Sequence, residues 1–178
     1  MRRNHVINAE NEAVVLFGLR ALLLLLVSVI SVLTIAGLMG TFFYTSFLLI
    51  NLVAIRSFTG GYHAQSRVSC FILTNIAVIL SNVLIIQLYL SMNTMSLWYA
   101  ISLLTILLLS PLDDEVRQST KAEKRRYRRI IIGVAVFQVV FLSLPVGHAF
   151  KTALLLSNSI VSILLIIGTI RLKCKKLK

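Results

Sequence analysis

A histidine and a cysteine seven residues apart are the residues in this sequence whose types and spacing best suit nucleophilic chemistry. They are His63 and Cys70, and the pair Gly60 and Gly61 precedes the histidine. An imidazole can accept the proton of a thiol and stabilise the thiolate, which is the attacking species. The pattern predicts a His63–Cys70 catalytic dyad. The alternative is an inert helix cysteine next to an interfacial histidine.

The spacing also constrains the backbone between the two residues. On one straight helix they would share a face but lie about 10 Å apart along the axis, which is too far for a hydrogen bond. The segment must therefore bend or re-enter, and irregular backbone at membrane depth is tolerated only where protein or water covers it. Gly60 and Gly61 permit tight geometry, and their N–H groups could face a developing oxyanion. A simple turn is the other interpretation.

The chain that must position this pair is too apolar for a soluble domain. Of its 178 residues 58% are hydrophobic, compared with about 45–50% in a soluble domain. The sequence predicts an all-α fold, a polytopic bundle of about six transmembrane helices with a re-entrant or bent catalytic segment. We expect one integral membrane domain over residues 1–178. Its spans are expected at roughly 22–38, 41–55, 68–90, 95–109, 130–144 and 152–170.

The charges predict the orientation of this bundle. The net charge is +12, and the basic residues gather near the N-terminus, in the block 117–129 and in the tail from 171. Lys151 is the only basic residue in the three expected outer loops, 37–41, 91–94 and 145–151. An excess of Lys and Arg marks cytoplasmic loops. We therefore expect a multi-pass cell-membrane protein whose termini and catalytic segment are cytoplasmic, and no nucleic-acid binding.

Two segments of the chain resemble the AgrB family of bacterial membrane proteins. The first has the pattern Arg-x-x-x-Gly-Gly-x-His-Ala, with a cysteine seven residues after the histidine, and spans residues 56–70. The second is Ser110, Pro111, Leu112 and Asp113, which a basic block follows. The chain has serine where the family often has alanine before the proline. Size, span count and charge layout are similar along nearly the whole chain.

The resemblance implies a cysteine endopeptidase that processes the precursor of a cyclic autoinducing peptide in quorum sensing. Cys70 would be its nucleophile and His63 its base. The substrate would be an AgrD-like precursor with an amphipathic leader and an acidic C-terminal tail. Cleavage before the tail would give an acyl-thioester, and an internal cysteine or serine of the precursor would then close a thiolactone or lactone ring.

Basic residues are the candidates for holding this substrate, together with Gly60 and Gly61. Arg56 could bind a carboxylate or brace its loop, or it could be a snorkelling interfacial arginine. Lys124, Arg125 and Arg126 could attract the acidic tail, or they could anchor the topology beside anionic lipid. We expect no metal, because the further histidines and Cys174 lie in other segments, and no cofactor.

Amide side chains inside the spans are expected to form hydrogen bonds between helices. They are Asn51, Asn75, Asn82, Gln87 and Gln138. Asn75 has a second interpretation, as a group that orients His63. Two competing functions remain, a small membrane transporter or peptide-export channel and a non-catalytic assembly subunit. The expected partners are the precursor peptide and the lipid bilayer, and a homodimer is left open.

Overall fold

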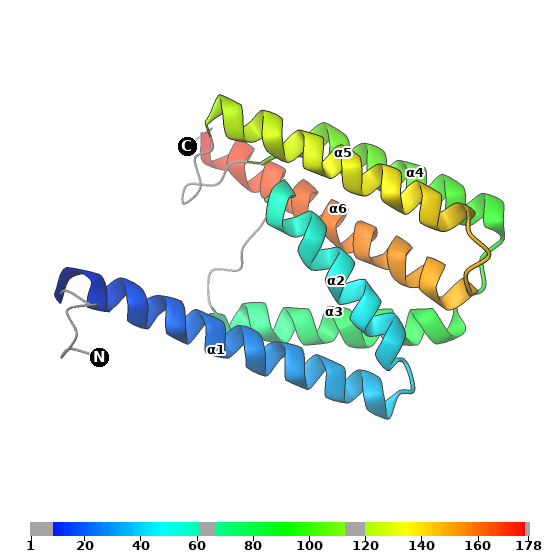
Figure 1. The fold of residues 1–178 in the computed structure, drawn as a ribbon, viewed down its shortest axis with the longest axis horizontal. Coiled ribbons are helices and arrows are strands. Elements are labelled where there is room, and N and C mark those ends of the chain that lie inside the picture. Colours follow the sequence, from blue (N-terminus) through cyan, green and yellow to red (C-terminus); the bar gives the residue numbers. More distant parts are fainter. Residues whose placement is uncertain (1–8, 61–66, 113–119, 177–178) are drawn as a thin grey trace.

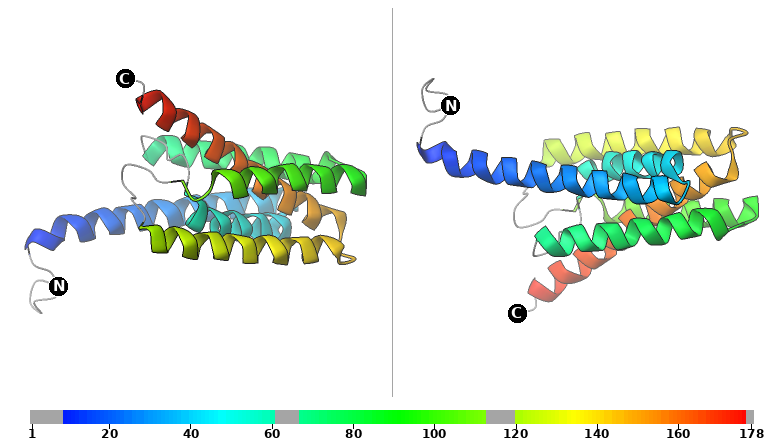
Figure 2. Two further views of the ribbon diagram at one scale, coloured as in Figure 1. Left: turned by 90° about the horizontal axis from the view of Figure 1, so that it is seen from above. Right: turned by 90° about the horizontal axis from the view of Figure 1, so that it is seen from below.

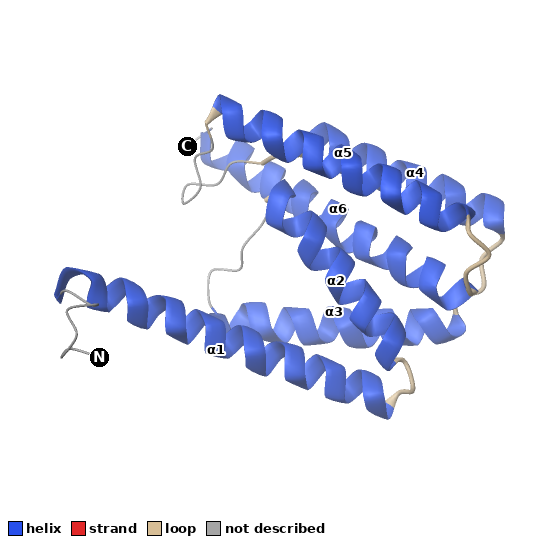
Figure 3. Cartoon of the chain, in the orientation of Figure 1, coloured by secondary structure: helices blue, strands red, loops and turns tan. Residues whose placement is uncertain are grey.

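The described residues of the chain form six α-helices. The structure is a computed structural model that describes residues 9–60, 67–112 and 120–176. Among these residues it contains helices and no strand (Figure 3), which confirms the all-α class. The helices are α1 (Ala9–Leu38), α2 (Phe42–Thr59), α3 (Arg67–Gln87), α4 (Met92–Leu109), α5 (Lys121–Ser143) and α6 (His148–Lys176).

Successive helices run in opposite directions, so the bundle has two distinct ends (Figure 1). One end holds the end of α2 and the start of α5, and α6 finishes there. We call it the basic end, because it carries Arg56, Lys121, Lys124, Arg125, Arg126, Arg128, Arg129, Arg171 and Lys173. The distal end holds the connections at Gly40, Leu90 and Gly147.

α6 forms the centre of the bundle. It packs against α2, α3 and α4, and all its residues from 151 to 158 are buried. α2, α4 and α5 complete a four-helix unit with α6, and α1 and α3 form a second layer beside it (Figures 1 and 2). α1 contacts only α3 and α2 extensively. This arrangement leaves much of α1 on the outside.

The outer surface of the bundle is apolar. Large hydrophobic side chains are exposed on every helix, for example Ile30, Ile50 and Leu108. Contiguous apolar surface of this extent is covered by lipid in a membrane protein. Three described helices are long and apolar enough to cross a bilayer: Phe42–Thr59, Met92–Leu109 and His148–Cys174. The chain is therefore a membrane protein.

Four helices begin at least three residues before the spans expected from the sequence: α1, α4, α5 and α6 begin at residues 9, 92, 121 and 148 instead of 22, 95, 130 and 152. α5 begins at Lys121, because Thr120 and Glu123 form a capping box. The Thr120 hydroxyl accepts from the Glu123 N–H at 3.3 Å, and the Glu123 carboxylate accepts from the Thr120 N–H at 2.8 Å. α6 begins at His148, so Lys151 is buried in its first turn. The expectation that Lys151 lies in an outer loop was wrong, because the helix starts just after Gly147.

Hydrogen bonds between polar side chains join four helices inside the bundle. Gln138 of α5 donates to Asn51 of α2 at 3.0 Å and accepts from Tyr99 of α4, also at 3.0 Å. Asn158 of α6 donates to the Gln138 carbonyl at 3.1 Å. We call Asn51, Tyr99, Gln138 and Asn158 the Gln138 cluster. All four side chains are buried.

The second layer is joined by similar contacts. Ser31 of α1 donates to Asn75 of α3 at 2.5 Å, and Thr45 of α2 donates to Asn82 of α3 at 2.6 Å. Interhelical hydrogen bonds were predicted for Asn51, Asn75, Asn82 and Gln138, and all four are confirmed. Gln87 instead lies exposed at the end of α3.

Candidate active site

α2 ends at a glycine with a positive φ angle. Gly60 follows Thr59 with φ 72°, and residues other than glycine rarely adopt a φ in this region. Its N–H donates to the carbonyl oxygen of Arg56 at 3.3 Å. This N–H therefore caps α2, and it is not directed to a substrate oxyanion as the sequence suggested. Gly61, the second glycine of the pair, lies outside the described residues.

The backbone on either side of this turn is bonded to the segment that follows α4. The N–H of Leu112 donates to the carbonyl oxygen of Thr59 at 2.9 Å. Gly60 and Leu112 also form an isolated parallel bridge. A Cβ atom on Gly60 would lie 2.5 Å from the Leu112 carbonyl oxygen, so the two backbones touch. We call Thr59, Gly60 and Leu112 the Gly60–Leu112 junction.

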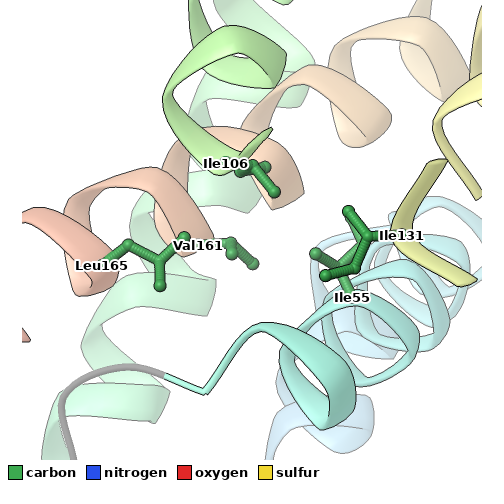
Figure 4. Close-up of a cluster of buried hydrophobic side chains, with 5 residues drawn as sticks. All are labelled: Ile55, Ile106, Ile131, Val161 and Leu165. Carbon is green, nitrogen blue, oxygen red and sulfur yellow. The ribbon is translucent and has the colours of Figure 1, made fainter. Parts of the chain in front are cut away.

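A hydrophobic cluster lies beneath the junction. Figure 4 shows five buried side chains that point toward one another from α2, α4, α5 and α6. They are Ile55, Ile106, Ile131, Val161 and Leu165. Leu112 and Phe58 pack against this cluster, and the Phe58 ring contacts the Tyr127 ring of α5 at 6.0 Å between centroids. The junction is therefore supported by the four-helix unit.

The end of α4 is also fixed by hydrogen bonds. Ser110 is buried, and both its N–H and its hydroxyl donate to the carbonyl oxygen of Ile106, at 3.0 Å and 2.5 Å. Two residues later the chain reaches Leu112 and the junction. The short segment from Ser110 to Leu112 is thus held at both ends by main-chain bonds.

The proposed dyad lies beside this junction in sequence, but only partly within the described residues. Cys70 is in the first turn of α3, at the basic end, and its side chain lies outside the described part. His63 and the expected bend fall in residues 61–66, also outside it. The dyad and its geometry therefore stay predictions.

The Asn75 side chain forms hydrogen bonds with groups other than His63, which the alternative interpretation named as its partner. Its amide nitrogen donates to the Phe71 carbonyl at 2.9 Å, and its amide oxygen accepts from Ser31. The amide oxygen thus serves the contact between α1 and α3, and the amide nitrogen bonds the backbone of α3 itself. The structure therefore gives no support to the idea that Asn75 orients His63.

The basic candidates gather at the same end as the junction. Arg56 is partly exposed in the last turn of α2. Lys124 is partly exposed and Arg125 and Arg126 are exposed near the start of α5, which packs against α2. A charge cluster of one sign raises the local concentration of an oppositely charged ligand. The arrangement suits an acidic peptide segment that approaches from the basic end.

A protein-family model covers nearly the whole chain. The family model AgrB, accessory gene regulator B, matches residues 1–172. The chain belongs to the AgrB family. No curated protein and no solved structure gave a significant match. This AgrB-family chain is therefore a membrane protein with an accessory gene regulator role.

Sequence reasoning missed the contact between the two AgrB segments. Gly60 and Leu112 were assigned to separate motifs, and neither hydrophobic periodicity nor charge reports a backbone bond between distant loops. Tyr99 and Asn158 of the Gln138 cluster were not singled out either. For Asn158 a signal existed, since an amide within an apolar run indicates an interhelical partner.

Proposed function

We propose that this protein is a membrane-embedded cysteine endopeptidase that removes the acidic tail of a small quorum-sensing precursor and promotes its cyclisation. The family match over residues 1–172 carries the proposal. Two further observations support it. Cys70 lies in the first turn of α3 at the basic end, and the two segments that resemble the family are bonded to each other at Thr59 and Leu112.

In the proposed reaction, the Cys70 sulfur attacks the carbonyl carbon of the peptide bond before the tail. His63 accepts the thiol proton and then gives it to the nitrogen of the departing tail. The acyl group stays on Cys70 as a thioester. An internal cysteine or serine of the precursor loses its proton to His63 and attacks this thioester. The ring closes as a thiolactone or lactone, and Cys70 leaves as a thiolate that His63 reprotonates.

This sequence of steps needs no cofactor. Exchange of one thioester for another makes and breaks bonds of the same kind, so ring closure requires no ATP. The Gly61 N–H is the remaining backbone candidate for the developing oxyanion. Arg56, Lys124, Arg125 and Arg126 bind the acidic tail by charge. By the positive-inside rule, the basic end, both termini and the catalytic segment face the cytoplasm of the bacterial cell.

The direct test uses purified protein in lipid vesicles with a synthetic precursor that has an amphipathic leader, one internal cysteine and an acidic tail. Mass spectrometry follows the tail and any adduct on the enzyme. We expect wild type and Cys174→Ser to release the tail, and Cys70→Ser and His63→Ala to lose release while remaining inserted. A covalent precursor adduct on Cys70 identifies the nucleophile.

The alternative functions make a different prediction for the same variants. If Cys70→Ser and His63→Ala cleave like wild type, the dyad is wrong. If no protein cleaves but the intact peptide crosses the vesicle membrane, the transporter interpretation is favoured. The Cys174→Ser control matters because Cys174 is an exposed thiol of α6 that could form adducts without any catalytic role.

A further inference from the structure

We propose that the Gly60–Leu112 junction positions the catalytic segment, with Gly60 and Leu112 as positioning residues. The inference deepens the proposed function and rests on it. Gly60 is the last described residue before residues 61–66, which lead to Cys70 at the start of α3. The main chain of Leu112 holds this exit point through the bond to Thr59 at 2.9 Å. The segment after α4 thereby becomes a part of the active site.

The bond at the junction is well placed to act as a fixed anchor. Thr59 is fully buried, and hydrogen bonds in a low-dielectric interior are stronger than hydrogen bonds in water. Leu112 packs on the hydrophobic cluster, and Ser110 is held by Ile106. The exit point is therefore tied to α4 and to the four-helix unit, and it does not depend on α2 alone. Catalysis demands this, because a misplacement of about 1 Å can cost about a hundredfold in rate.

Gly60 is required at the junction for two separable reasons. Its φ of 72° disfavours any side chain, and a Cβ atom would meet the Leu112 carbonyl oxygen at 2.5 Å. Gly40 is the matched control, because it has φ 70° but nothing within 4 Å of its Cβ position. Alanine at Gly40 carries only the strain of the positive φ. Alanine at Gly60 must also displace the backbone of Leu112.

The first experiment compares Gly60→Ala with Gly40→Ala in the precursor-cleavage assay. We expect kcat of Gly60→Ala to fall about ten- to a hundredfold with little change in KM, because substrate binding is kept and the dyad is displaced. Gly40→Ala should retain wild-type kcat. Thermal unfolding in detergent shows whether the two variants are equally folded.

A second perturbation removes the hydrogen bond without a clash. Replacement of Leu112 by its α-hydroxy acid analogue keeps the side chain but replaces the N–H by an ester oxygen, so the bond to the Thr59 carbonyl is lost. Leu107→Ala is the control, because Leu107 packs against the same hydrophobic cluster but takes no part in the junction. We expect the ester to lower kcat at least tenfold, as at Gly60, and Leu107→Ala to lower stability with kcat nearly unchanged.

The reactivity of the Cys70 thiol gives a readout that is independent of proteolysis. In a Cys174→Ser background, the rate of alkylation of Cys70 is measured against pH. A free thiol titrates at about 8.5, and a neighbouring imidazolium lowers this value. We expect the profile of Gly60→Ala and of the Leu112 ester to move toward that of His63→Ala, whereas Gly40→Ala keeps the wild-type profile.

The outcomes separate this inference from the function on which it rests. Wild-type kcat and alkylation in Gly60→Ala and in the Leu112 ester would overturn the positioning role and leave the peptidase intact. Equal losses in Gly40→Ala and Gly60→Ala would also overturn it, since φ strain alone would then explain the effect. If wild type cleaves no precursor, the proposed function fails. The junction is still supported as a positioning device if the alkylation profile of Cys70 shifts in Gly60→Ala and not in Gly40→Ala.

Discussion

Replacement of Gln138 by leucine is expected to destabilise the bundle more than any other single amide substitution. The Gln138 side chain bonds Asn51, Tyr99 and Asn158, which come from three other helices. The substitution leaves the Asn51 oxygen and the Asn158 amide without these partners in a buried site. Tyr99 keeps only a longer contact to the Ala135 carbonyl at 3.4 Å. The loss is thus concentrated in the centre of the four-helix unit.

The size of the effect follows from the number of partners. Interhelical hydrogen bonds in membranes average about 0.6 kcal/mol, whereas a buried polar group left unsatisfied costs about 1–3 kcal/mol. With three partners affected, we expect Gln138→Leu to lower the free energy of unfolding by about 2–5 kcal/mol. Gln87→Leu is the matched control, because Gln87 is exposed at the end of α3. It should change stability by less than about 0.5 kcal/mol.

The chain contains a convenient reporter for this measurement. Trp98 is its single tryptophan, and the indole N–H donates to Ser159 of α6 at 3.1 Å. Its fluorescence during denaturation in mixed micelles therefore follows the separation of α4 from α6. A double-mutant cycle adds Tyr99→Phe, which should cost about 1 kcal/mol in wild type and almost nothing in Gln138→Leu.

Equal stability of Gln138→Leu and Gln87→Leu would refute this reasoning. The reasoning would also be refuted if Tyr99→Phe lowered the free energy of unfolding by the same amount in Gln138→Leu as in wild type. The Tyr99 hydroxyl would then be stabilised by a group other than Gln138. Either result would mean that apolar packing alone holds the four-helix unit together.

Three further predictions concern other contacts. Cysteines introduced at Ser31 and Asn75 in a cysteine-free background should form an oxidative cross-link between α1 and α3, seen by altered gel mobility. Thr120→Ala should cost about 1 kcal/mol at the start of α5, seen as faster amide hydrogen exchange in its first turn. Charge reversal of Arg125 and Arg126 should slow processing more at low salt than at high salt, because screening weakens the attraction.

Each of these has a control that separates the stated cause from a general effect. A cysteine at Ile30, whose side chain is exposed, should cross-link to position 75 poorly, and equal yields would contradict the α1–α3 contact. Thr105→Ala removes a hydroxyl that bonds only its own helix, and it should leave the start of α5 unchanged. A precursor with a neutral tail should show no salt dependence in the charge-reversed variant, and equal losses at both salt levels would exclude steering.

The sequence predicted the helices well because apolar runs and charge clusters decide where lipid-covered segments lie. It placed the starts of α1, α4, α5 and α6 less well. At α5 the cationic residues after Thr120 suggested a cytoplasmic loop, yet lysine and arginine are good helix formers, and Thr120 and Glu123 provide a cap. The expected loop 145–151 was drawn too long, because α6 begins directly after Gly147 and buries Lys151 in its first turn.

The candidate site could be predicted only in part. Residue types and spacing singled out His63 and Cys70, since few side chains can form a nucleophile–base pair. The same reasoning assigned the Gly60 N–H to the substrate, because a glycine pair before a catalytic histidine suggests an oxyanion site. Its actual partner, the Arg56 carbonyl, follows from where α2 ends. The contact with Leu112 depends on how α2 and α4 pack, and no local pattern encodes that.

The central position of α6 also has a consequence for how the protein is made. α6 leaves the ribosome after the other five helices, yet it packs against α2, α3 and α4. Until α6 inserts, Gln138 lacks its Asn158 partner and the buried faces of α2 and α4 remain in lipid. The first five described helices must therefore remain incompletely packed in the bilayer until α6 inserts.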